Sequence, residues 1–307
     1  MKNYTSEQPI NSSNVQTMET AKRIINRLSI KKPEGSLRLL ARWSFEPYRL
    51  ITSSLRLMPS FIIIGSQKGG TTSLYRYLIQ HPHVKSAVTK ELHFFDVNFD
   101  KGSDWYRSRF PLSTQDFLTG EASPSYIFHP HAPKRIAELT PSVKLIALLR
   151  NPVDRAYSHY KDNLRKKKEN LSFEAAIEKE VERLSGGLER MLKNEDYSNG
   201  SYLRYSYLGR GIYVDQLSKW FNLFSKEQFL ILKSEDFYTN PVTCFNQVLD
   251  FLELSEWQLE EYKQFNSNSD LKNQAINPHT RRQLIDYFKP HNQRLSELLG
   301  MSFDWER

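Results

Sequence analysis

Cysteine is almost absent from this chain, and its scarcity limits the possible chemistry. Cys244 is the single cysteine among 307 residues, which excludes an internal disulfide. A chain without disulfides suits a reducing compartment, so we expect a cytoplasmic protein. The segment from Val242 to Leu254 is apolar and periodic, which favours burial of Cys244 over reactivity. The sequence has no zinc-type cysteine and histidine spacing and no HExxH element, so no metal site is predicted.

Long hydrophobic runs are absent as well. No 18 consecutive apolar residues occur, which argues against a transmembrane helix. The first 30 residues are polar and lack the apolar centre of a signal peptide. Both absences favour a soluble enzyme.

Composition divides the chain into three parts. Residues 1–20 are rich in Ser, Asn, Thr and Gln, and we expect a disordered N-terminus. Residues 21–58 interleave Leu and Ile with Lys and Arg, which predicts a basic amphipathic extension. It could pack on its own domain, meet a partner, or make a peripheral contact with an anionic membrane. Residues 59–307 contain no linker and are predicted to form one α/β domain.

Charge gives a coarse indication of the partners. The formal net charge is +8, so anionic ligands should be attracted. The positive charge is spread along the chain and no nucleic-acid-binding module is apparent, which argues against a nucleic-acid partner. The densest run, residues 165–168, is either a solvated helix face or a rim that steers an acceptor.

The most informative segment predicts a strand, a phosphate-binding loop and a helix in direct succession. Phe61 to Ile64 are apolar, three of them β-branched, and stop at a glycine, which indicates a buried strand. From Leu74 to Ile79 apolar residues recur at helical spacing. Glycines between these elements let the backbone approach an anion, and a helix N-terminus supplies N–H groups. A strand–glycine–helix turn without a ligand is the alternative.

The loop departs from the nucleoside triphosphate motif GxxxxGK[ST] in one place. Gly65 and Gly70 have the required separation, but Thr71 stands where the lysine should be. The lysine, Lys68, lies inside the loop instead, where it could reach the distal end of a bound group. Thr71 and Thr72 offer hydroxyls to a phosphate, so a magnesium-bound triphosphate is not the expected ligand.

A second strand also ends at a candidate phosphate ligand. Residues 143–149 are predicted to form a buried strand that leads into Arg150, and Pro152 suits the first turn of a helix. Ser158 then lies two turns into that helix, where it could share one phosphate with Arg150. Ligands of open α/β sheets gather at the carboxyl ends of strands. A charged amphipathic helix without a ligand is the alternative.

Between the two strands, Glu91 is a candidate base, and His93 lies near it beside two phenylalanines. In an extended chain both side chains point to one face. Burial beside aromatic rings should raise the pKa of Glu91, which suits a base that takes a hydroxyl proton. The alternative is an ion pair with Lys90 or with a nearby arginine. His93 is expected to be structural or a reserve base.

Together these segments resemble sulfotransferases that use 3′-phosphoadenosine 5′-phosphosulfate (PAPS), in particular the heparan sulfate type. The resemblance implies a three-layer α/β fold with a central parallel sheet and a P-loop-like phosphosulfate-binding loop. It also implies that Glu91 is the catalytic base and that Lys68 is catalytic. The implied cofactor-binding residues are Lys68, Gly69, Gly70, Thr71, Thr72, Ser73, Arg150, Ser158 and Tyr213.

Weaker matches extend the resemblance to Trp305. Glu121, Ser123 and Tyr126 are similar to the family's acceptor-cleft element, although Ala122 replaces a lysine, and Lys90 is added as an acceptor contact. Residues 277–300 resemble the family's terminal helix. The preceding stretch offers only Ser269 and Lys272 as residues that close over the cofactor. Residues 202–213 are expected to supply tyrosine platforms near the adenine, or a tyrosine-rich hairpin in the core.

The resemblance implies transfer of a sulfuryl group from PAPS to a hydroxyl or amine, which leaves 3′,5′-ADP. The expected acceptor is a saccharide, a glycolipid or another glycoconjugate, or a carrier-bound hydroxyl. Two other functions stay open: a P-loop kinase of a small substrate, and a non-catalytic nucleotide-binding protein.

Overall fold

The computed structural model describes residues 45–113, 116–195, 197, 199–265 and 275–306. The chain divides into two units, Met1–Arg49 and Leu50–Arg307. In the first unit only residues 45–49 are described, and they are helical. The predicted disordered segment and most of the predicted amphipathic extension therefore lie outside the described residues. No helix of the described part is both long and apolar enough to cross a bilayer.

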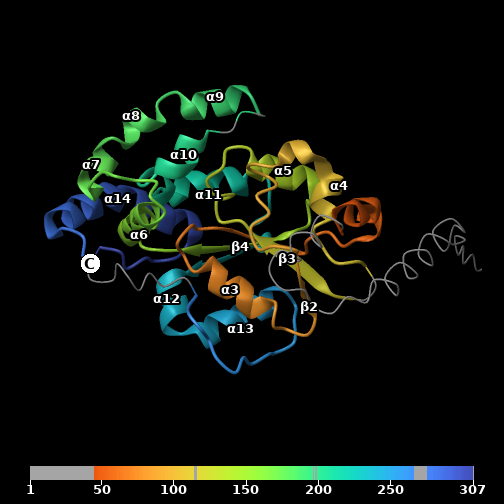
Figure 1. Ribbon diagram of the computed structural model, residues 1–307. Helices are drawn as coiled ribbons and strands as arrows, with labels where there is room; N and C mark the ends of the chain where they lie inside the picture. Colours follow the sequence, from red (N-terminus) through yellow and green to blue (C-terminus); the bar gives the residue numbers. More distant parts are fainter. Residues whose placement is uncertain (1–44, 114–115, 196, 198, 266–274, 307) are drawn as a thin grey trace, which may run out of the picture. The chain divides into compact units, whose positions relative to one another are not determined.

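The second unit is built on a five-stranded sheet whose neighbouring strands all pair in parallel (Figure 1). The strand order is β2-β3-β1-β4-β5. The bounds are Phe61–Gly65 for β1, Val84–Ser86 for β2, Leu118–Ala122 for β3, Lys144–Leu149 for β4 and Phe229–Lys233 for β5. The two strands predicted from sequence are the adjacent central strands β1 and β4, in register at Ile63 and Ile146.

Helices cover both faces of this sheet. Alternate residues of β1 point to opposite faces and therefore pack into two different cores. Phe61 and Ile63 pack in one core with α3 (Thr71–Leu78) and α13 (Pro241–Phe251). Ile62 and Ile64 pack in the other, which includes residues of α11 (Tyr213–Phe221) and α14 (Pro278–Leu299). The three-layer α/β fold with a central parallel sheet is thus confirmed. The other helices are α4 Gly102–Arg107, α5 Ala132–Leu139, α6 Pro152–Arg165, α7 Phe173–Glu178, α8 Glu180–Leu184, α9 Gly187–Lys193, α10 Gly200–Tyr205 and α12 Ser234–Thr239.

Two neighbouring strand ends place the site. The carboxyl end of β1 leads through residues 66–70 into α3, and that of β4 leads through residues 150–151 into α6. Because β1 and β4 are paired in parallel, both connections leave the same edge of the sheet. Any ligand held by both loops must lie at this edge.

Three expectations outside the sheet can be compared with the structure. Cys244 is buried on α13 as expected. The terminal helix runs to Leu299 and ends at Gly300, whose positive φ of 64° suits glycine. The tyrosine-rich segment is α10 followed by a short 3-10 helix and α11, so the hairpin alternative is wrong. Tyr202, Tyr207 and Tyr213 are nevertheless core residues, as that alternative proposed.

Candidate functional site

The loop between β1 and α3 is fixed against its neighbours. The Ser66 hydroxyl donates to the Leu148 carbonyl at 2.7 Å, and the Ser234 hydroxyl donates to the Gly69 carbonyl at 2.7 Å. A Cβ atom on Gly69 would lie 2.5 Å from the Leu148 carbonyl oxygen. The loop therefore sits in one position against β4, and only glycine fits there.

The first turn of α3 borders a cavity. Gly70 precedes the helix with φ of +103°, and no side chain of the described residues caps the N-terminus. Thr71 and Thr72, the first two helical residues, line a cavity of about 1010 Å³. The N–H groups of a first helical turn and the helix dipole make such a terminus a favourable place for a phosphate.

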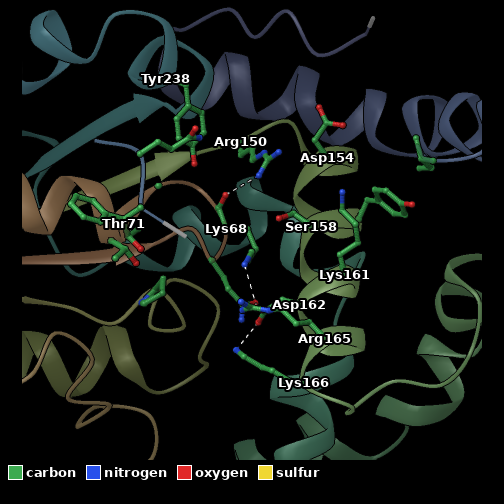
Figure 2. A pocket seen from close by; sticks show the side chains of 18 of the residues that line it. Lys68, Thr71, Arg150, Asp154, Ser158, Lys161, Asp162, Arg165, Lys166 and Tyr238 are labelled. Carbon is green, nitrogen blue, oxygen red and sulfur yellow. Dashed lines mark hydrogen bonds and ion pairs between the residues drawn. The ribbon is translucent and has the colours of Figure 1, made fainter. Parts of the chain in front are cut away.

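Lys68 reaches from the loop toward α6 (Figure 2). Its backbone has a positive φ of 73°, a conformation that non-glycine residues adopt mainly at functional sites and turns. Its ammonium lies 3.7 Å from a carboxylate oxygen of Asp162. Burial lowers the pKa of Lys68, and the charge of Asp162 offsets part of that effect.

Arg150 and Ser158 come from the end of β4 and from α6, and both line the same cavity. The Arg150 guanidinium donates to the Lys68 carbonyl at 3.1 Å, so it joins the two loops. The side chain of Asn151 caps α6 by accepting from the amides of Val153 and Asp154. The structure thus brings together the predicted ligands of two separate phosphates.

The cavity lining carries an excess of positive charge. Among the described residues six cationic side chains and three carboxylates contribute to it, a difference of three charges. Such a lining favours an anionic ligand over a neutral one. The cations are Lys68, Arg150, Lys161, Arg165, Lys166 and Arg281, and the carboxylates are Glu91, Asp154 and Asp162.

Glu91 also lines this cavity, in a chain of charged groups. Lys90 donates to one Glu91 oxygen, and the His93 ring lies 3.4 Å from the other. The second ring nitrogen of His93 lies 3.0 Å from Asp96. Glu91 and His93 therefore lie together, although His93 has a positive φ of 49° and the segment is not the extended strand that was expected. Asp96, which sequence reasoning did not select, completes the group.

The pKa values of this group correct one prediction. Burial favours a raised pKa for Glu91, as predicted, but the hydrogen bond from His93 and the charge of Lys90 outweigh it and lower that pKa to about 2. Burial also opposes the charged form of His93, yet Asp96 and Glu91 raise its pKa to about 10. The ion pair that was the alternative for Glu91 is thus present. At neutral pH Glu91 is ionised and His93 is protonated, so His93 cannot act as a base in this state.

Glu121, Ser123 and Tyr126 have no exposed surface, so the acceptor contact expected for them is replaced by a supporting role. Hydroxyls of Ser123, Tyr126 and Tyr106 all donate to the Glu121 carboxylate. Burial raises the pKa of Glu121 to about 7, although these three hydrogen bonds lower it. The Ser123 hydroxyl oxygen also accepts from the His93 amide at 3.2 Å, so this network supports the segment that carries Glu91 and His93.

Several other predicted residues support the site from buried positions. The Tyr213 hydroxyl donates to the Arg150 carbonyl at 2.9 Å, so it fixes the strand end. Ser73 is 1% exposed and accepts from the Phe265 amide, which makes cofactor contact through its hydroxyl unfavourable. The Lys90 ammonium forms an ion pair with the Glu91 carboxylate. Ser269 and Lys272 lie outside the described residues.

Sequence reasoning missed part of the cavity wall. Arg165, from the basic run that was predicted to be a solvated face or an acceptor-steering rim, lines the cavity, but Lys161 and Asp162 were not selected. These two residues follow Ser158 at spacings of three and four residues, which is the helical period that identifies one face of α6. That signal was available in the sequence. Arg281 was not predictable from spacing, because α14 brings it to α6, where it pairs with Asp154.

Comparison with known proteins identifies the fold and the chemistry. Residues 58–299 match the family described as "Sulfotransferase domain". The chain belongs to the sulfotransferase family. The sulfotransferase is 28% identical to the membrane-associated sulfotransferase kil1 of Dictyostelium discoideum, over 83% of this chain and 68% of that protein. It is 31% identical to the Mus musculus heparan sulfate glucosamine 3-O-sulfotransferase 3A1, over 84% of this chain and 67% of that one.

A solved structure supports the same conclusion. The sulfotransferase from Alicyclobacillus acidocaldarius has a TM-score of 0.68 and 29% identity, and the match covers 82% of this chain and all of that one. The protein is therefore an enzyme that transfers sulfuryl groups. The kinase and the non-catalytic nucleotide-binding protein are not favoured. The described residues hold no cluster of three or more His, Cys, Asp or Glu side chains suited to a metal ion.

Proposed function

We propose that this sulfotransferase uses PAPS as its donor and a hydroxyl group of a saccharide or glycoconjugate as its acceptor. One observation carries the donor: two sets of anion ligands from adjacent strand ends line a single cavity of about 1010 Å³. PAPS has two phosphorylated ends, a 5′-phosphosulfate and a 3′-phosphate. A ligand with one phosphate group would leave one set unused.

The residues divide between these two ends. Lys68, Thr71, Thr72 and the amides at the start of α3 would hold the 5′ end, where PAPS supplies the sulfuryl group. Arg150 and Ser158 would hold the 3′-phosphate and so select PAPS over ATP. The fixed loop means that little reorganisation is needed at these positions, which is where charge stabilisation is most effective.

Glu91 is the base in this proposal. It lies on the cavity, it is ionised, and 43% of its side chain is exposed, so an acceptor hydroxyl can reach it. Its low pKa makes it a weak base while Lys90 and His93 are paired with it. We infer that a bound acceptor displaces at least one of these pairs, which would raise the pKa of Glu91 toward the working range.

The saccharide acceptor rests on the relatives and on charge. Three heparan sulfate glucosamine 3-O-sulfotransferases align over 81–84% of this chain at 30–32% identity. Lys161 and Arg165 of α6, and Lys166 directly after it, line the wall of the cavity and would attract an acidic saccharide. An amine or a carrier-bound hydroxyl is the other acceptor class for the same base. A cytoplasmic location and a peripheral membrane contact through residues 21–58 remain proposals.

A transfer assay tests both halves of the proposal. Purified protein with 35S-labelled PAPS should label a saccharide fraction, and acidic polysaccharides should be labelled before neutral ones. Label in a carrier protein or in an amine, with no label in any saccharide, would contradict the proposal that the acceptor is a saccharide. If 3′,5′-ADP binds but the label of PAPS is transferred to no acceptor, the assignment of the catalytic group is contradicted.

A further inference from the structure

Asp162 is a carboxylate that faces the donor site and has no role in the mechanism so far. It lies on α6 four residues after Ser158, so both side chains share one helix face (Figure 2). It is 5% exposed and lines the cavity. A buried carboxylate in a cavity that should bind a polyanion opposes that binding, so its presence requires a reason.

Three cations surround Asp162, and they are not equivalent. Arg165 and Lys166 each donate to it at 2.6 Å, one to each carboxylate oxygen. Lys68 lies at 3.7 Å, which is beyond the range of a normal hydrogen bond. Lys68 is therefore held by charge alone on a carboxylate that already accepts two strong hydrogen bonds. Of the three contacts it is the one most easily exchanged for another anion.

The position of Lys68 makes that exchange consequential. Lys68 belongs to the loop that would hold the 5′ end of the donor, and its carbonyl accepts from Arg150 at the proposed 3′-phosphate site. Its ammonium cannot give its full charge to an anion on the loop while it compensates Asp162. An anion on the loop would also repel Asp162.

We propose that Asp162 is a positioning residue that competes with the 5′ group of the nucleotide for Lys68. Before the nucleotide binds, Asp162 holds the ammonium at α6. When the product leaves, Asp162 takes the ammonium back. The carboxylate thereby weakens nucleotide binding and accelerates the release of 3′,5′-ADP. This inference rests on the proposed function, because it needs Lys68 to contact the 5′ end.

Asp154 provides a matched control on the same helix. It is a second carboxylate of α6 that lines the cavity, but it pairs with Arg281 and not with Lys68. Replacing either aspartate by asparagine removes one negative charge from the cavity. A general electrostatic effect would therefore appear in both variants, whereas competition for Lys68 would appear only in Asp162→Asn.

The test is calorimetric titration with 3′,5′-ADP of the wild type, Asp162→Asn, Asp154→Asn, Lys68→Ala and Lys68→Ala/Asp162→Asn. Asp162→Asn should bind about tenfold more tightly than the wild type and release the nucleotide correspondingly more slowly. The same substitution should have no effect in the Lys68→Ala background, since the competed group is gone. Thermal unfolding checks that each variant folds, and Asp162→Ser serves if the asparagine variant does not.

Failure of the inference and failure of the proposed function have different signatures. A wild type that does not bind 3′,5′-ADP would overturn the proposed function. Binding without tightening in Asp162→Asn would overturn the inference alone. Tightening that persists without Lys68 would assign the effect to Arg165 and Lys166. If Asp154→Asn bound 3′,5′-ADP equally more tightly, the effect would be due to the net charge of the cavity. Either of these two results would overturn the inference that Asp162 competes for Lys68.

Discussion

Glu91 shows how far a single side chain depends on its charged neighbours. The sequence places it beside phenylalanines, which predicts a raised pKa, but the fold also places Lys90 and His93 on its two oxygens. Those contacts decide the sign of the shift and bring the pKa to about 2. Neighbouring residue types were visible in the sequence, whereas the balance between burial and pairing needed the geometry.

Replacement of Glu91 by glutamine tests the base. Glutamine keeps the shape of the side chain but cannot accept the proton of the acceptor. Single-turnover transfer should therefore fall by about 100-fold or more, with little change in the affinity for 3′,5′-ADP. Glu138→Gln, at an exposed position on α5, is the control and should retain normal transfer. Near-normal transfer by the Glu91 variant would remove Glu91 from the chemistry.

His93 gives a prediction about the pH dependence of stability. Its pKa is about 10 in the folded protein and 6.5 as the ordinary value, because Asp96 and Glu91 stabilise the charged ring against the effect of burial. A raised folded pKa contributes stability that is complete below about pH 6.5 and is lost as the pH rises toward about 10. The free energy of unfolding should therefore differ most between the wild type and His93→Gln at about pH 6.

Denaturant unfolding at about pH 6, 8 and 10 measures this difference, which should shrink at each step. Solvent reduces its size, since 36% of the His93 side chain is exposed. His279→Gln, at the exposed start of α14, controls for the loss of one histidine. A difference between wild type and His93→Gln that stays constant or grows with pH would show that the ring is not held in its charged form.

At the scale of elements, the loop between β1 and α3 depends on the close approach of Gly69 to β4. An alanine Cβ there would lie 2.5 Å from the backbone oxygen of Leu148, which cannot move without β4. Gly69→Ala should lower the free energy of unfolding by about 2 kcal/mol or more and abolish binding of 3′,5′-ADP. Differential scanning calorimetry and titration would measure the two effects.

Gly200→Ala is the matched control for this element. Gly200 begins α10, and beyond its chain neighbours and its own helix backbone, no atom of the described residues lies within 4 Å of a Cβ built on it. Alanine there should change the free energy of unfolding by less than about 1 kcal/mol, and in the stabilising direction. If Gly69→Ala behaved like this control, the loop would not be fixed as described.

The elements that the sequence predicted are those with strong local signals. β1, β4 and the start of α6 at Pro152 follow from apolar runs and from a proline that favours a first turn. The short edge strand β2, Val84–Ser86, has no such run, whereas strand β5 begins with four consecutive apolar residues, Phe229 to Leu232, and was predictable from the same signal. The contact between Lys68 and Asp162 joins residues 94 positions apart, and no local pattern specifies it. The burial of Glu121 was not predictable either. A carboxylate is expected to be exposed unless its hydrogen-bond donors are known, and here the donors are three hydroxyl groups.

In the molecule as a whole, the parallel sheet brings together side chains that are far apart in the sequence. The carboxyl ends of β1 and β4 bring Lys68 and Arg150 within one hydrogen bond of each other, although they are far apart in the chain. α6 adds Ser158 and Asp162, and the segment before β3 adds Glu91. We propose that this assembly contains two phosphate sites at different positions.

Thermal unfolding with three nucleotides at equal concentration tests that claim most directly. 3′,5′-ADP fills both sites, 5′-AMP fills one, and ATP with magnesium places its charge along a single chain of phosphates. A ligand at about 100 times its dissociation constant stabilises by about 2.7 kcal/mol, so the shift ranks the affinities. We predict a much larger rise in Tm with 3′,5′-ADP than with either of the others. Equal rises with 3′,5′-ADP and ATP would contradict the account.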